Sequence, residues 1–145
     1  MPTRSSVTEA GVMLADPIGG LRVMASSSER MRAMELFEVQ NQDGPCLDAW
    51  TTRALVSEGD LTGAGLTRWP AFAPMAIDAG FASVYALPMR LRDNCIGALN
   101  LFAERPNGLS HDDALLGPAL ADVASIGILQ ERLTREQNVV TEQLQ

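Results

Sequence analysis

Two cysteines, Cys46 and Cys95, offer the most reactive side-chain chemistry in this sequence. Cys46 follows Pro45 at the predicted start of a helix, where unpaired backbone N–H groups and the positive end of the helix dipole lower the pKa of a thiol. Cys95 opens a predicted strand directly after a turn. Two such thiols are candidates for a redox sensor, although a free cysteine more often serves as a small buried apolar residue. The sequence alone gives no distance between the two side chains.

Other catalytic chemistries find no support in the residue pattern. His111 follows Ser110, a good helix-capping residue, and therefore belongs to a solvated first helical turn. Asp112 and Asp113 suit the helix dipole there, and as helical neighbours they point to different faces rather than forming an acid/base pair. The glycines between 59 and 65 lack the flanking strand and helix of a phosphate-binding loop. With one histidine and two cysteines, we predict no catalytic residues and no metal site.

The composition indicates one globular domain with an acidic surface. The 145 residues are 46% hydrophobic and carry a net charge of −7, from 11 basic and 18 acidic side chains. All the basic residues are arginine, as codon bias in a GC-rich genome would produce. Selection for bidentate recognition would instead need an arginine cluster, and Arg90 with Arg92 is the nearest approach to one. The acidic balance argues against binding of nucleic acid by this segment.

No stretch of the sequence predicts membrane insertion or secretion. No apolar run approaches the ~18 residues of a transmembrane helix. The N-terminal residues also lack the apolar core of a signal peptide. We therefore expect a cytoplasmic protein with no membrane partner.

Apolar runs, turn residues and helix caps divide the chain into strands and helices. Strands are predicted at 10–16, 21–26, 53–57, 83–92 and 95–103, and helices from Ser27 or Ser28, from Pro45, over 68–79 and from Ser110 toward Gln145. Met31, Met34, Leu36 and Phe37 are expected to form the apolar face of the first helix, and Pro74 predicts a kink or break in the third. The order predicts an α+β fold: a GAF/PAS-like antiparallel sheet of five or six strands, flanking helices and a long C-terminal helix.

The order of these elements resembles a GAF domain, a small-molecule sensor module related in architecture to PAS domains. Several segments more closely resemble the GAF half of bacterial GAF–ANTAR regulators, and the likeness extends from about Thr8 to Gln145. These segments are GVMLAD at 11–16, GPCLDA at 44–49, ALPMRLR at 86–92, IGALNLF at 96–102, and LADVA at 120–124 with LQER at 129–132.

The resemblance implies a modular regulator of transcription antitermination, in which a sensory domain precedes an RNA-binding ANTAR domain. Residues 1–133 are accordingly expected to form the GAF sensory domain, and residues 134–145 a helical linker toward an ANTAR domain outside this sequence. The signal would be an unidentified small molecule or a redox change, and no cofactor is implied. Asn100 and Phe102 match part of the cyclic-nucleotide signature of some GAF domains, but the lack of any lysine leaves that signature incomplete.

The resemblance also suggests where a ligand would bind. In a GAF-like fold the segment from the second helix to Gly80 covers one face of the sheet and encloses a pocket, and the few aromatic side chains gather in this region. The pocket candidates are Cys46, Trp50, Trp69, Phe72, Met75, Phe81, Tyr85 and Met89. Plain packing in the core is the alternative for each of them.

The last predicted helix carries a heptad pattern. Ala119, Ile126, Leu133 and Val140 recur at heptad spacing, and the helix becomes polar beyond Leu133, where a lone helix is marginal in water. We expect homodimerisation through the helix 111–145, as a parallel bundle that passes ligand-induced shifts to the output domain.

Two other functions remain open. One is a dimerisation or interaction module with a filled core and no ligand. The other is an enzyme, since some GAF proteins reduce free methionine sulfoxide with clustered cysteines. Two cysteines in separate halves of the chain disfavour that activity, and we predict that the protein is not an enzyme.

Overall fold

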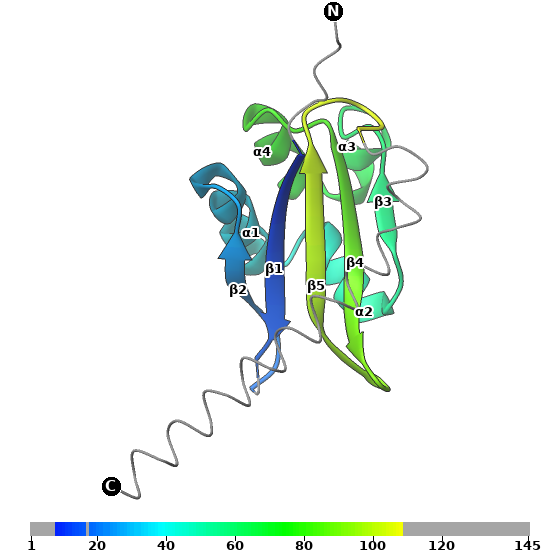
Figure 1. The fold of residues 1–145 in the computed structure, drawn as a ribbon. Helices are drawn as coiled ribbons and strands as arrows, with labels where there is room; N and C mark the ends of the chain where they lie inside the picture. The colour runs from blue at the N-terminus through cyan, green and yellow to red at the C-terminus, as the bar shows by residue number, and fades with distance from the viewer. Residues whose placement is uncertain (1–7, 17, 109–145) are drawn as a thin grey trace, which may run out of the picture.

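Five antiparallel strands form one sheet in the computed structural model, which describes residues 8–16 and 18–108. The elements in order are β1 (Thr8–Ala15), β2 (Leu21–Ser26), α1 (Glu29–Asn41), α2 (Pro45–Thr52), β3 (Val56–Glu58), α3 (Ala64–Arg68), α4 (Phe72–Asp78), β4 (Ser83–Leu91) and β5 (Asn94–Ala103). The strand order is β2-β1-β5-β4-β3 (Figure 1). The expected α+β fold with an antiparallel sheet and flanking helices is confirmed. The predicted helix from Ser110 lies outside the described residues.

The two faces of the sheet carry different apolar clusters, because successive side chains of a strand point to opposite faces. On one face Met13, Val84 and Phe102 pack against buried residues of the helices, and Figure 1 shows the helices gathered behind the strands. On the other face, a separate buried cluster consists of Leu14, Leu87, Met89 and Leu99. Functional groups carried by the helices must therefore meet the first of these faces.

Strands β1 and β5 lie in close contact at Gly97, which pairs with Leu14. A Cβ atom added at position 97 would lie 2.0 Å from the backbone oxygen of Met13. That distance is far below van der Waals contact, and the obstructing atom belongs to the backbone of the neighbouring strand. Glycine is therefore required for this register of β1 against β5.

The helix starts show two modes of capping. As predicted, Ser28 caps α1, with its Oγ accepting the Met31 N–H at 3.0 Å, and α2 begins at Pro45. Helix α4 has no capping side chain of its own sequence. Instead Asp43, in the loop between α1 and α2, accepts the N–H groups of Ala71 and Phe72, each at 2.9 Å from its Oδ2. The start of α4 thus depends on a distant segment.

The predicted strand at 53–57 begins too early, since β3 covers only Val56–Glu58. Arg53 ends α2 in the left-handed conformation, with φ 57°. An extended strand cannot include that conformation.

The predicted helix over 68–79 is wrong, because α3 ends at Arg68 and α4 begins at Phe72. Proline disfavours the helical conformation of the residue before it, and Trp69, before Pro70, has φ −132° and ψ 77°. Pro74 lies in the first turn of α4, where its missing N–H has no helical partner to lose. The chain therefore breaks at Pro70 and continues through Pro74.

Replacement of Gly97 by alanine should destabilise the protein strongly. The new Cβ would force β1 and β5 apart at a backbone contact, and overpacking of this kind costs about 2 kcal/mol or more. Urea denaturation of Gly97→Ala measures the effect. Ser57→Ala, on the exposed part of β3, is the control and should change the free energy of unfolding by less than about 0.5 kcal/mol. Equal stability of Gly97→Ala and the wild type would contradict the close approach of the two strands.

Candidate functional site

Two glutamates face the protein interior from α1. The buried residues of this helix are Met31, Met34, Glu35 and Glu38, a spacing that defines one helical stripe. Leu36, predicted to be part of that stripe, is instead 39% exposed. Both glutamate side chains are fully buried, at 0% exposure. Because a buried charge is costly unless it is partnered, these carboxyls mark a specialised part of the core.

Glu35 is held between the sheet and α1 by two polar neighbours. The Ser26 hydroxyl donates to its Oε1 at 2.5 Å, and the Asn100 Nδ2 donates to its Oε2 at 3.2 Å. Gly11 of β1 leaves the space for this carboxyl, since a Cβ there would lie 2.4 Å from the carboxyl oxygens. Burial raises the pKa of Glu35 to about 7, against the opposing effect of the two hydrogen bonds. The group therefore titrates near neutral pH.

Glu38 reaches the start of α2. Its Oε2 accepts the backbone N–H of Cys46 at 3.0 Å, and Gly44 leaves room for the carboxyl. Burial raises the pKa of Glu38 well above its ordinary value, and the charge of Glu35 adds to the shift. Among the described residues, neither Glu38 Oε1 nor the buried Asn100 Oδ1 has a hydrogen-bond partner. Two buried oxygen atoms in this cluster therefore lack a hydrogen-bond partner.

Of the two interpretations of Cys46, the structure favours the small buried apolar residue over the activated thiol. Burial raises the pKa of its thiol well above the ordinary value, and the charges of Glu38 and Glu35 raise it further. The main physical reason is the complete burial of the side chain, and the Glu38 carboxyl that accepts the Cys46 backbone N–H adds to it. Cys46, at 0% exposure, is a buried small side chain of the core.

Cys95 lies in a different environment. It is half-buried on β5, and its Sγ contacts the backbone oxygen of Gly97 at 3.4 Å. A redox pair formed by Cys46 and Cys95 stays a prediction.

The central aromatic side chains pack against one another on the helix-covered face. Ring centroids are 6.0 Å apart between Trp69 and Phe72, 5.6 Å between Phe72 and Phe102, and 5.3 Å between Phe81 and Phe102, all edge to face. Trp69 also donates from Nε1 to Asp48 at 2.8 Å. These contacts make the cluster part of a packed core.

The predicted pocket residues separate into two groups. Those that lie together in the helix-covered core, with Trp50 packed at its margin, are Cys46, Trp50, Trp69, Phe72 and Phe81. The others do not join them. Met75 is 42% exposed on α4, and Met89 belongs to the cluster on the opposite face. Tyr85 lies on that opposite face as well, since its strand neighbours Val84 and Ala86 point toward the helices.

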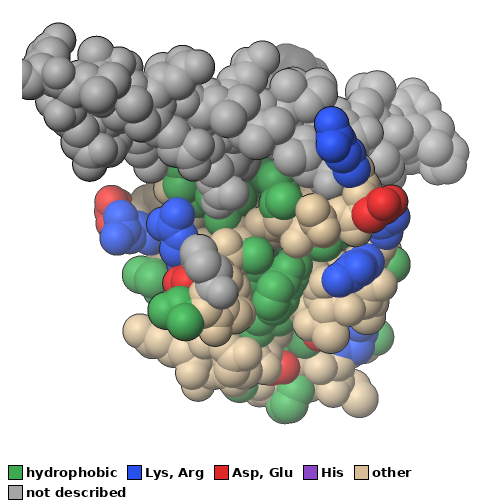
Figure 2. All heavy atoms as spheres, turned by 90° about the horizontal axis from the view of Figure 1, so that it is seen from below, with side chains coloured by type: hydrophobic (Ala, Val, Ile, Leu, Met, Phe, Trp, Pro, Cys, Tyr) green, Lys and Arg blue, Asp and Glu red, His purple; other side chains and the backbone are tan. Residues whose placement is uncertain are grey.

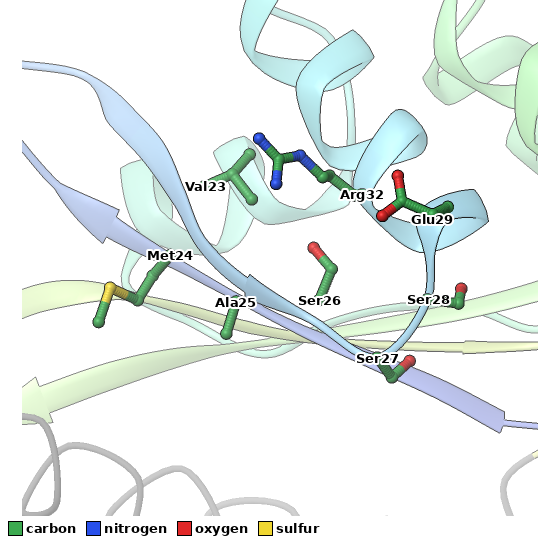
Figure 3. A pocket seen from close by; sticks show the side chains of 8 residues that line it. All are labelled: Val23, Met24, Ala25, Ser26, Ser27, Ser28, Glu29 and Arg32. Carbon is green, nitrogen blue, oxygen red and sulfur yellow. The ribbon is translucent and has the colours of Figure 1, made fainter.

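A hollow of about 420 Å³ lies beside β2 and the start of α1. Its lining is mainly polar and consists of Val23, Met24, Ala25, Ser26, Ser27, Ser28, Glu29 and Arg32. Figure 3 shows the Ser26 side chain between the strand and the helix that carries Arg32. None of the predicted pocket residues lines this hollow. Ser26 joins it to the buried cluster, because its hydroxyl binds Glu35.

Sequence reasoning missed Glu35, Glu38, Ser26 and the role of Asn100. The available signal was the i, i+3, i+4, i+7 spacing of Met31, Met34, Glu35 and Glu38, which places two acids on the inward face. The apolar pair Leu36 and Phe37 fits the same helical period on the neighbouring face of the helix. Spacing alone does not decide which of these two faces is buried.

The described residues contain no cluster of metal ligands and no membrane-spanning helix. No group of three or more histidine, cysteine, aspartate or glutamate side chains in that part of the chain is placed to hold a metal ion. Nor does any helix there have the length and apolar character needed to cross a bilayer.

Comparison with known sequences identifies no relative, whereas comparison of folds identifies several. No protein-family model matches the chain, and no curated protein matches it. The GAF domain of a phosphoenolpyruvate-protein phosphotransferase from Acinetobacter superposes with a TM-score of 0.66 at 15% identity, covering 88% of this chain and 74% of that one.

Two further solved structures have the same fold. The GAF domain/HD domain protein from Geobacter sulfurreducens has a TM-score of 0.63 at 17% identity, covering 90% of this chain and 85% of its own. Type II free methionine-R-sulfoxide reductase from Thermoplasma acidophilum has a TM-score of 0.61 at 18% identity, covering 83% and 77%. At these identities the comparisons define the architecture, and the chain has the GAF fold.

Glu35 should make the stability of the protein depend on pH. Its pKa of about 7 lies above the ordinary value of 4.5, so the folded protein keeps a proton that the unfolded chain releases. The contribution of Glu35 is therefore fully present below about pH 4.5 and falls by about 3 kcal/mol as the pH rises through about 7. Glu38 has a shift of the same sign and cannot reverse this slope.

The variant Glu35→Gln should lose the part of the slope that Glu35 contributes, because its amide stays neutral, and should keep the part due to Glu38. The Ser26 hydroxyl can accept from the amide NH₂ while the amide oxygen accepts from Asn100. Urea denaturation across about pH 5 to 8 measures the difference. Glu29→Gln, exposed in the first turn of the same helix, is the matched control and should keep the wild-type slope. Parallel curves for wild type and Glu35→Gln would show that Glu35 is not the titrating group.

Proposed function

We propose that this chain is the sensory domain of a cytoplasmic GAF–ANTAR transcription antitermination regulator, and that it binds a small polar molecule beside β2. The observation that carries the proposal is the position of Ser26. This residue lines the 420 Å³ hollow and donates to the buried Glu35. A ligand that bonds Ser26 would therefore change the hydrogen bonding and proton affinity of an interior carboxyl.

The hollow suits a small molecule with polar groups. Its volume lies within the range of ligand pockets. Three consecutive hydroxyl side chains, Ser26, Ser27 and Ser28, and the charged Glu29 and Arg32 supply donors and acceptors along its lining. A ligand with both donor and acceptor atoms matches this lining better than an apolar one.

A change at Ser26 has a physical route into the core. Glu35 shares α1 with Glu38, which binds the first turn of α2 through the Cys46 N–H. Asn100 of β5 donates to the same Glu35 carboxyl. Rearrangement of one hydrogen bond thus affects α1, α2 and the central strand β5 together.

In the proposed regulator, the C-terminal residues pass the signal from the sensory domain to the output domain. We infer that residues 1–133 are the sensory unit and that the helix 111–145 forms a homodimer. Residues 134–145 would lead to an RNA-binding ANTAR domain. The 145-residue chain itself binds neither nucleic acid nor membrane, in keeping with its net charge of −7.

The chemistry of the cysteines favours sensing over catalysis. The Thermoplasma acidophilum enzyme shares the fold, but thiol chemistry requires a reactive thiolate. Cys46 is buried with a raised pKa. A redox signal read by Cys46 and Cys95 is consequently a weaker form of the proposal than a bound small molecule.

Ligand binding can be tested with Ser26→Ala. Native mass spectrometry should detect a small molecule that co-purifies with the wild type, and thermal-shift screening of polar metabolites should find one that stabilises it. Loss of the Ser26 hydroxyl should weaken that binding by about fivefold or more. Ser57→Ala is the control. A wild type that binds nothing in either experiment would favour the alternative of a dimerisation module with a filled core.

Dimerisation through the helix 111–145 can be tested by light scattering. The full chain should show twice its mass of 15.6 kDa. Val140→Glu, which places a charge on the predicted seam, should shift the protein to the monomer. Val139→Glu adds the same charge beside the seam and should stay dimeric. A wild type that is monomeric at high concentration would contradict the predicted dimer.

A further inference from the structure

Three arginine side chains line one hollow at the end of the molecule that carries the β4–β5 turn. Arg53 follows α2, Arg90 lies in β4, and Arg92 lies in the turn before β5. Together with Asp93 and Cys95 they line a space of about 170 Å³. Figure 2 looks onto this end of the molecule and shows basic side chains on both sides of a central apolar area. The fold thus adds Arg53 to the arginine pair at 90 and 92.

The backbone conformation does not favour arginine at two of these positions. Arg53 and Arg92 both have φ 57°, in the left-handed region that glycine and asparagine occupy more readily. Arg90 is oriented by a hydrogen bond from its Nη2 to the backbone oxygen of Arg53. That bond ties the end of α2 to β4, and it fixes one edge of the hollow.

The arginine cluster carries an excess of positive charge among the described residues. Guanidinium groups stay protonated in proteins. The ion pairs in the described part of the chain use Arg30 and Arg68, and none of them involves Arg53, Arg90 or Arg92. In a protein of net charge −7, three arginines that form no ion pair with the described residues, with Asp93 as the one acidic side chain in the lining, form a local positive site.

We propose that this hollow binds a phosphate-type dianion, as free phosphate or as the phosphate group of a small phosphomonoester. Three positive charges against the single Asp93 leave an excess that matches a dianion. The planar guanidinium fork binds the oxygens of such a group in pairs. A space of about 170 Å³ is large enough to hold such a group. It shares no residue with the hollow beside β2, so the site is independent of the proposed sensory function.

Titration calorimetry with inorganic phosphate and with glycerol phosphate, at ionic strength held constant with chloride, tests the proposal. The wild type should bind at least one of the two saturably, and the arm that binds identifies the source of the group. Arg92→Gln and Arg53→Gln should each weaken binding by about tenfold or more, because each removes charge-assisted hydrogen bonds. Arg22→Gln, exposed on β2, makes the same change of charge elsewhere and should leave binding unchanged.

Cys95 provides a second readout, since it lines the hollow and is half-buried, whereas Cys46 is fully buried. A bound anion should slow alkylation of Cys95 by iodoacetamide in the wild type and should not do so in Arg92→Gln. Two results would overturn the proposal: no saturable binding of either anion by the wild type, or equal weakening by Arg92→Gln and Arg22→Gln. Ser26→Ala should bind the anion normally, which separates this site from the proposed sensory hollow.

Discussion

The interior position of two carboxyl groups is the constraint on which the surrounding structure depends. Glu35 and Glu38 occupy helical positions that would ordinarily hold apolar side chains, and neither reaches solvent. Burial favours their neutral forms, and each needs hydrogen-bond partners and space. Gly11 and Gly44 supply the space, while Ser26, Asn100 and the start of α2 supply the partners. The residue types at these positions in β1, β2, β5 and the start of α2 are thus explained by the two buried glutamates of α1.

This arrangement gives the GAF fold of the chain a polar centre within an apolar layer. The aromatic cluster around Phe72 and Phe102 fixes the helices against the sheet, and it carries no titratable group. The polar cluster has the opposite character, because two of its buried oxygen atoms lack partners and one carboxyl titrates near neutral pH. Such a network is sensitive to the loss or gain of a single hydrogen bond. The apolar packing holds the helices on the sheet, and the polar cluster is the part of the core that changes when a hydrogen bond or a proton is lost or gained.

Sequence patterns predicted the sheet well because hairpin signals and caps are local. Ser28 and Pro45 start their helices as expected, and the β4–β5 hairpin follows its turn residues. Outcomes that depend on distant groups were not predicted. The pKa of Cys46 is raised by burial and then by the charge of Glu38, a residue eight positions earlier that folds back onto the α2 start. The arginine hollow likewise needs Arg53, which is separated from Arg90 by 37 positions. Neither contact has a signature in residue spacing.

The capping of α4 by Asp43 couples the stability of that helix to a distant loop. A helix as short as Phe72–Asp78 is unstable alone in water. Its first N–H groups find their acceptor in the loop after α1. Phe72, in the first turn of α4, also packs edge to face against Trp69 and Phe102. Loss of the single carboxylate at position 43 would therefore loosen α4 and the aromatic cluster together.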